Sequence, residues 1–179
     1  MIEEIIKETR KWLTSFIIEH QICPFARREY EKESIIYDVV ISDNSEEQLL
    51  ALIFACKKLD EDKEAETTLI IFPNGLDNFD DYLDFLALSD ALMHKQGYEG
   101  IYQLASFHPD YCFDGVGSDD VSNYSNRSPY PMLHLIREES LERVLAHYPN
   151  PEKIPKRNIE YIRELGVDYL LELLKKCKE

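Results

Sequence analysis

The segment from Asn126 to Glu138 (NRSPYPMLHLIRE) contains most of the side chains in this sequence that could bind a ligand or act on one. Ser128 followed by proline is a favoured helix start, so the pattern predicts a helix over residues 129–147. On such a helix His134 and Arg137, three residues apart, would share one face. Arginine binds carboxylates and phosphates through two parallel hydrogen bonds. We therefore expect a site for a small anionic molecule, formed by Asn126, Arg127, Ser128 and Arg137. The alternative is that the arginines form structural salt bridges.

Three residues could carry acid–base or nucleophilic chemistry. His108 follows a predicted strand, and its imidazole, like that of His134, titrates near neutral pH, so both histidines are candidate general acids or bases. Cys23 is the candidate nucleophile, but it follows a predicted helix whose dipole disfavours a thiolate. In the alternative interpretation His108 binds loop backbone and Cys23 is a buried structural thiol.

A metal or nucleotide site has little support in the sequence. Metal ligands from Cys23, His108 and His134 would come from three distant segments, and no short-spaced zinc motif is present. We therefore predict no metal site. The glycine-rich motifs of dinucleotide-binding and P-loop proteins are both absent, so neither kind of nucleotide site is indicated, and the cofactor stays unknown.

The charge and the apolar content of the sequence argue against nucleic acid and membranes as binding partners. The 179 residues include 35 Asp and Glu against 20 Lys and Arg, a net charge of −15, which repels nucleic acid and anionic lipid. No stretch reaches the ~20 apolar residues of a membrane span, and the N-terminus is acidic where a signal peptide would be basic. We therefore expect a cytoplasmic protein with neither nucleic acid nor membrane as a partner. Its four cysteines are widely spaced and are expected to be free thiols.

The predicted elements follow the order helix, β-α-β-α-β, then three helices. Apolar residues at three- and four-residue steps predict a first helix over 2–21. Helical crossovers between strands favour parallel pairing. We therefore predict an α/β fold in one domain, residues 1–179, with a three-stranded parallel sheet. Strands are expected at 34–41, 67–72 and 101–107, internal helices from 45 and over 77–96, an ordered loop over 108–128, and C-terminal helices at 129–147, 152–165 and 168–177. The helices within 150–179 would pack on the domain or extend from it.

Several unusual strings resemble a bacterial and plastid family known as domain of unknown function 1415. They are Cys23-Pro24-Phe25-Ala26, Glu66-Thr67-Thr68-Leu69, Leu104 to Tyr111 (LASFHPDY), Asn126 to Pro131 (NRSPYP), His134-Leu135, Arg137-Glu138 and His147-Tyr148-Pro149. The resemblance extends from about Trp12 to Gly166 and implies one domain, but no activity. Family members often have His-Pro after the second strand. This chain has Phe72-Pro73 there, so no catalytic or metal-binding histidine is expected at that position.

These observations lead to one expected function and two alternatives. The first is an enzyme that acts on a small anionic substrate, with arginines that bind the anion and His108, His134 or Cys23 in the reaction. The second is a non-catalytic binding module that presents its acidic surface to a basic partner. The third is a metalloprotein that uses Cys23, His108 and His134.

Overall fold

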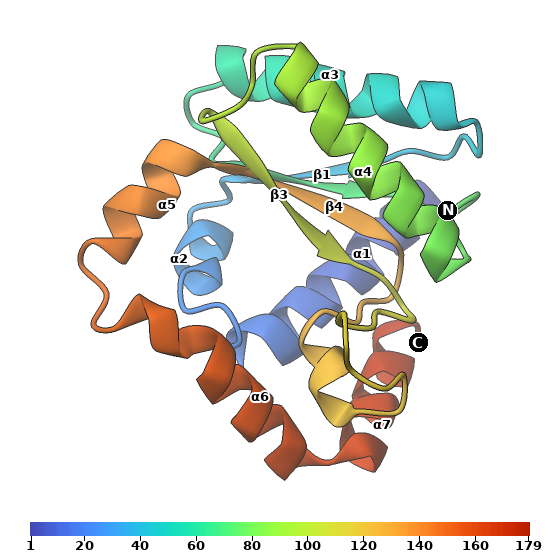
Figure 1. Cartoon of the computed structure of the whole chain (residues 1–179), viewed down its shortest axis with the longest axis vertical. Helices are drawn as coiled ribbons and strands as arrows, with labels where there is room; N and C mark the ends of the chain where they lie inside the picture. Colours follow the sequence, from blue (N-terminus) through green and yellow to red (C-terminus); the bar gives the residue numbers. More distant parts are fainter.

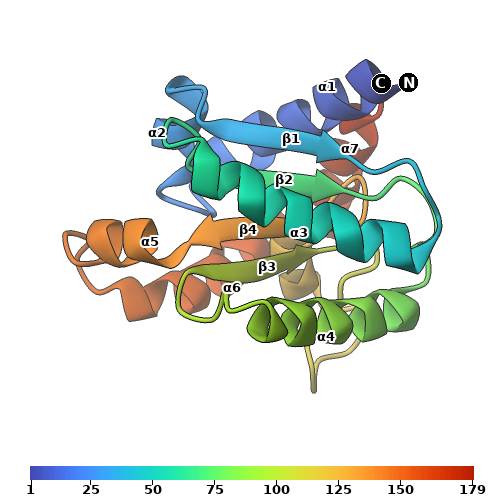
Figure 2. The ribbon, with the colours of Figure 1, turned by 90° about the horizontal axis from the view of Figure 1, so that it is seen from above.

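A mixed four-stranded sheet lies between two layers of helices (Figures 1 and 2). The computed structural model describes all residues, 1–179. The strands are β1 (Ile35–Val39), β2 (Thr67–Ile71), β3 (Tyr102–Phe107) and β4 (Met132–Arg137). They lie in the spatial order β1-β2-β4-β3. β1 and β2 are parallel, whereas β4 is antiparallel to both β2 and β3.

The fourth strand corrects the predicted fold. The parallel pairing of the first two strands is confirmed, but the sheet is not a three-stranded parallel one, because β4 lies between β2 and β3. The predicted helix over 129–147 is wrong: residues 132–137 form β4, and a helix, α5 (Glu138–Leu145), follows at once. The run MLHLI suits a buried helix and a doubly covered strand equally well. Hydrogen bonds to strands on both sides of β4, all distant in sequence, select the strand.

One face of the sheet is covered by α3 (Ser45–Glu61) and α4 (Phe79–Lys95). Each helix begins after an asparagine whose side-chain oxygen accepts two backbone N–H groups, Asn44 for α3 and Asn78 for α4. The core on this face is apolar and includes Leu52, Ile70, Phe85, Leu133 and Leu135. These two helices therefore bury this face of the sheet.

The other face is covered by helices from both ends of the chain. They are α1 (Ile2–Trp12), a π-helix, η1 (Leu13–Ile18), α6 (Ile154–Leu165) and α7 (Val167–Cys177). Trp12, Phe16, Leu69, Ile162 and Leu170 belong to the core on this side. The C-terminal helices therefore pack against the core and agree closely with the predicted ranges 152–165 and 168–177.

The predicted helix over 2–21 changes type at Leu13. The π-helix is wider than an α-helix, and the Thr14 and Ser15 hydroxyl groups donate to carbonyls of the preceding turn. Beyond it, His20 contacts the Tyr161 hydroxyl group at 2.9 Å and the Tyr169 hydroxyl group at 3.0 Å. These contacts attach α6 and α7 to the end of the N-terminal helix.

Three short helices complete this side: α2 (Ala26–Glu31), which the sequence analysis missed, and the 3₁₀ helices η2 (Val121–Ser125) and η3 (Pro151–Lys153). Among all the helices, none combines the length and apolar character that crossing a membrane requires.

Candidate functional site

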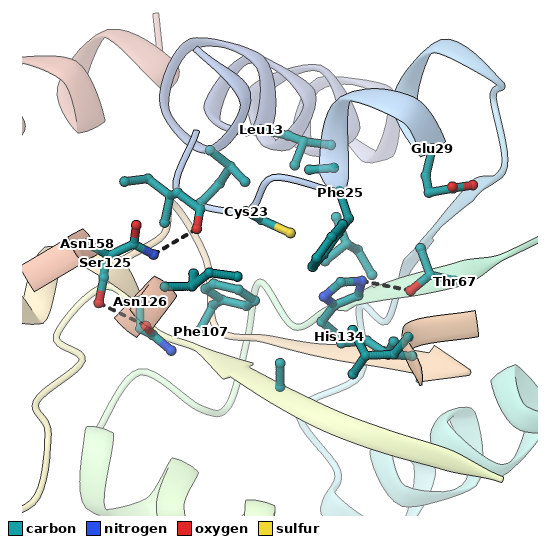
Figure 3. A pocket seen from close by; sticks show the side chains of 18 of the residues that line it. Leu13, Cys23, Phe25, Glu29, Thr67, Phe107, Ser125, Asn126, His134 and Asn158 are labelled. Carbon is teal, nitrogen blue, oxygen red and sulfur yellow. Dashed lines mark hydrogen bonds between the residues drawn. The ribbon is translucent and has the colours of Figure 1, made fainter. Parts of the chain in front are cut away.

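A cavity of about 720 Å³ lies between the sheet and the helices of the α1 face (Figure 3). Most of its lining side chains are hydrophobic. They come from the N-terminal helix (Trp12, Leu13, Ile17), the sheet (Leu69, Ala105, Phe107, Ile136), the turn before α2 (Phe25), α5 (Leu141, Val144) and α6 (Ile154, Ile159). The volume falls in the range of roughly 300–1,000 Å³ that is typical of small-molecule sites.

His134 faces this cavity from the centre of the sheet. It lies on β4, between Leu69 of β2 and Ala105 of β3. Its Nε2 atom is 2.7 Å from Oγ1 of Thr67, and that oxygen is 2.5 Å from the Leu135 carbonyl oxygen. A carbonyl only accepts, so the single hydroxyl hydrogen of Thr67 is donated to Leu135. Thr67 must therefore accept from His134, which assigns the hydrogen to Nε2.

The other ring nitrogen of His134, Nδ1, then has a lone pair and no hydrogen-bond partner in the chain, and Figure 3 shows it directed into the cavity. Burial among apolar walls lowers the pKa of His134 to about 4. The imidazole is therefore neutral at neutral pH, and it presents a hydrogen-bond acceptor to the cavity.

Cys23 points into the same cavity from the opposite wall (Figure 3). Burial raises the pKa of its thiol, and the backbone N–H groups of Phe25 and Ala26 oppose this only in part. No hydrogen bond joins Cys23 to His134, so the two groups face a common space as a neutral thiol and a neutral imidazole.

Two amides lie at the end of the cavity away from Thr67. Asn126 donates from Nδ2 to the Ser106 carbonyl and accepts from the Ser125 hydroxyl group. Asn158 donates from Nδ2 to the Ile22 carbonyl over 2.7 Å. Each Nδ2 carries a second hydrogen that no bond within the chain uses. These amides add donors to a largely apolar wall.

Sequence reasoning missed Asn158 and Thr67. A signal for Asn158 exists, because it follows Ile154 and precedes Ile162 at four-residue steps and so interrupts an apolar helix stripe. The role of Thr67 depends on a partner from another strand, and no local pattern indicates it.

Four charged side chains also line the cavity. Arg28 lies 3.5 Å from Glu29, Arg143 donates to the Ser140 hydroxyl group, and Glu66 has one carboxylate oxygen that is buried without a partner. Both arginines are exposed, so they belong to the mouth of the cavity rather than to its interior. Two positive and two negative groups leave the cavity lining close to neutral.

The other expected site residues lie outside the cavity lining. His108 is fully buried: its Nε2 contacts the Leu76 carbonyl at 2.9 Å and its Nδ1 accepts from the backbone of Asp110, which matches the alternative interpretation of loop support. Ser128 is not a helix cap, because its hydroxyl group donates to the Tyr130 carbonyl. Arg127 donates to the carbonyls of Tyr111 and Ser118.

Arg137 is separated from His134 by the sheet itself. Residues three apart on a strand point to opposite faces, so the expectation that these two share a helix face is wrong. The Arg137 guanidinium donates to the Tyr102 hydroxyl group and to three backbone carbonyls at and beyond the end of α3, those of Leu59, Asp62 and Ala65. An anion site that uses Arg127 and Arg137 stays a prediction, and nothing in the cavity depends on it.

The structure therefore brings together Cys23, Asn126 and His134 from the expected set. It does not place His108 with them, and it contains no group of three or more His, Cys, Asp or Glu side chains arranged to hold a metal ion. The metalloprotein alternative with Cys23, His108 and His134 stays a prediction.

Fold and site together define a mixed α/β protein with an apolar cavity beside its central sheet. The chain belongs to the family described as "Protein of unknown function (DUF1415)", which matches residues 4–172. No curated protein and no solved structure matches this chain.

Proposed function

We propose that this protein binds a small, largely apolar organic molecule in the cavity between its sheet and the α1 face. The observation that supports the proposal is the cavity itself, about 720 Å³ in volume and lined mainly by hydrophobic side chains. Transfer of apolar groups from water into such a space contributes about 0.8 kcal/mol for each CH₂ group buried. A molecule of modest size therefore has a substantial driving force to enter.

The sequence predicts a small anionic ligand. This proposal also has a small molecule as the ligand, but an apolar one. The arginines expected to bind an anion, Arg127 and Arg137, donate to backbone carbonyls elsewhere. The arginines that line the cavity, Arg28 and Arg143, are exposed at its mouth. An anionic group in the interior would lose hydration without gaining a cation, so a neutral apolar molecule fits better.

The test uses N-phenylnaphthylamine, a neutral dye that becomes fluorescent in apolar surroundings. Trp12 is the single tryptophan of the chain and lines the cavity, so energy transfer from Trp12 to the dye reports binding at this place. We expect saturable transfer with the natural protein. Absence of saturable binding would overturn the proposal.

A matched pair of variants locates the bound dye. Ala105→Phe adds a ring beside His134, in the cavity, and should weaken binding by at least tenfold. Ala87→Phe makes the same change at an exposed position of α4, on the other side of the sheet, and should leave binding unchanged. Equal binding by both variants would place the dye outside the cavity and contradict the proposal.

An enzyme acting on the same molecule is the second candidate, because Cys23 and His134 both face the cavity. Its test is p-nitrophenyl hexanoate, an apolar ester. Attack by Cys23 would form a thioester bond, release p-nitrophenolate and transfer the thiol proton to Nδ1 of His134. Mass spectrometry should then find one hexanoyl group on Cys23, and less of it in His134→Gln. Unmodified Cys23 at saturating ester would exclude this candidate and leave the binding function intact.

A further inference from the structure

We infer that the molecule bound in this cavity carries a hydroxyl group that donates a hydrogen bond to Nδ1 of His134. The inference rests on the proposed function, because it specifies the polar group of the same ligand. It begins with the contacts that orient the imidazole ring.

Those contacts form a one-way chain of hydrogen bonds. Nε2 of His134 donates to Oγ1 of Thr67, and Oγ1 donates to the Leu135 carbonyl. Leu135 belongs to β4, like His134, and Thr67 belongs to the neighbouring strand β2, so the chain of bonds is built into the sheet. The ring cannot take its other tautomer without leaving Thr67 Oγ1 with no hydrogen to accept. Nδ1 is therefore held as an acceptor.

The surroundings of Nδ1 make a ligand donor favourable. The residues beside His134 on the sheet are Leu69, Ala105 and Phe107, and none of their side chains carries a donor. A ligand that fills the cavity shields Nδ1 from water, and an acceptor left without a partner in this way costs about 1–3 kcal/mol. A ligand O–H group that reaches Nδ1 removes this cost.

The same surroundings select a hydroxyl group over other donors. An ammonium group at Nδ1 would place a positive charge among Leu69, Ala105 and Phe107, and desolvation of a charge beside apolar side chains is expensive. An amide N–H brings a carbonyl that needs a donor of its own nearby, and the spare amide hydrogens of Asn126 and Asn158 are at the other end of the cavity. A hydroxyl group on an apolar body supplies the donor without adding a charge or a carbonyl group.

The experiment compares two isomers that differ only in their ability to donate. n-Decanol and methyl nonyl ether have the same atoms, and the ether has no O–H. Each is titrated against the N-phenylnaphthylamine complex, and displacement gives its dissociation constant. We expect the natural protein to prefer the alcohol by about five- to tenfold, the effect of one neutral hydrogen bond.

Variants connect the preference to His134. His134→Phe keeps a flat aromatic ring but removes the acceptor, so the preference for the alcohol over the ether should fall to about one, while the ether binds as before. His94→Phe is the control, because His94 is exposed on α4, and it should keep the preference. Equal binding of alcohol and ether by the natural protein would overturn the inference. This measurement uses the natural protein alone, so it does not depend on the folding of any variant.

Failure of the hydroxyl inference and failure of the proposed function give different results in these titrations. Dye binding without a preference for the alcohol contradicts the hydroxyl inference and leaves the proposed function in place. Absence of dye, alcohol and ether binding contradicts both. Decanoate is the third arm: if it binds more tightly than n-decanol and Arg143→Ala removes that advantage, the cavity selects an anion through its mouth and the inference is wrong.

Discussion

Nε2 of His134 and Oγ1 of Thr67 lie 2.7 Å apart across two neighbouring antiparallel strands, and this contact decides which ring nitrogen faces the cavity. Thr67 in turn donates to the Leu135 carbonyl over 2.5 Å. Both side chains therefore take their positions from neighbouring strands of the sheet. The cavity thus has a fixed acceptor on one wall, while its opposite wall is made of helices and loops.

Thr67→Val removes the acceptor for His134 and keeps the shape of the side chain. The Nε2–H group then has no partner at a buried site, and the free energy of unfolding should fall by about 1–3 kcal/mol. Urea denaturation followed by Trp12 fluorescence measures this change.

Thr68→Val provides the matched control for that experiment. Thr68 is the next residue on β2, is 1 % exposed, and its hydroxyl group is buried without any partner. Its replacement removes an unsatisfied polar atom, so the free energy of unfolding should stay the same or rise. Similar losses in the two variants would show that the contact between Thr67 and His134 contributes nothing specific.

The lowered pKa of His134 predicts a stability change between pH 6.5 and about 4. The folded protein holds this imidazole neutral down to about 4, whereas in the unfolded chain it takes up a proton near the ordinary value of 6.5. Stability from this group is therefore complete above pH 6.5 and lost as the pH falls to about 4. At about 1.4 kcal/mol per pKa unit, the full loss is on the order of 3 kcal/mol.

His134→Gln isolates this effect, because every other titrating group is common to both proteins. Urea denaturation at several pH values should show the natural protein losing stability faster than the variant on acidification. Two parallel curves between pH 6.5 and 4 would refute the burial of a neutral His134.

Cys23 should react slowly with iodoacetamide, because burial raises its thiol pKa. We expect the labelling rate of Cys23 to rise only well above neutral pH, and n-decanol to slow it further by filling the cavity. Peptide mass spectrometry gives the rate for each cysteine of the natural protein. Cys112 does not line the cavity and is the internal control, whose rate the alcohol should leave unchanged. Rapid labelling of Cys23 near neutral pH would support a reactive nucleophile instead.

Arg137→Met should destabilise the fold by about 2–4 kcal/mol. The guanidinium binds the carbonyls of Leu59, Asp62 and Ala65, so its loss leaves acceptors unpaired between the end of α3 and the start of β2. Arg143→Met is the control, since Arg143 is exposed and donates only to Ser140, and it should change stability by less than about 0.5 kcal/mol. A small effect of Arg137→Met would return Arg137 to the list of groups free to bind a ligand.

Much of the fold could be predicted from local pattern. The apolar steps of α3, α4, α6 and α7 repeat within a few residues along one helix face, and the β1-α3-β2 order requires a long crossover that favours parallel strands. The same kind of reasoning disfavoured a thiolate at Cys23, because this residue follows the first helix. These features depend on near neighbours in the chain.

Tertiary structure alone decided the rest. The run from Met132 to Ile136 fits a helix or a strand, and only hydrogen bonds to β2 and β3 make it the central strand. That choice turns Arg137 to one face of the sheet and His134 to the other, towards Thr67 and Cys23. Such pairings join residues far apart in sequence, and their free energy comes from a partner that no local window contains. The sequence by itself thus determined the helices and the first pair of strands, whereas the cavity and its acceptor exist only because distant segments meet.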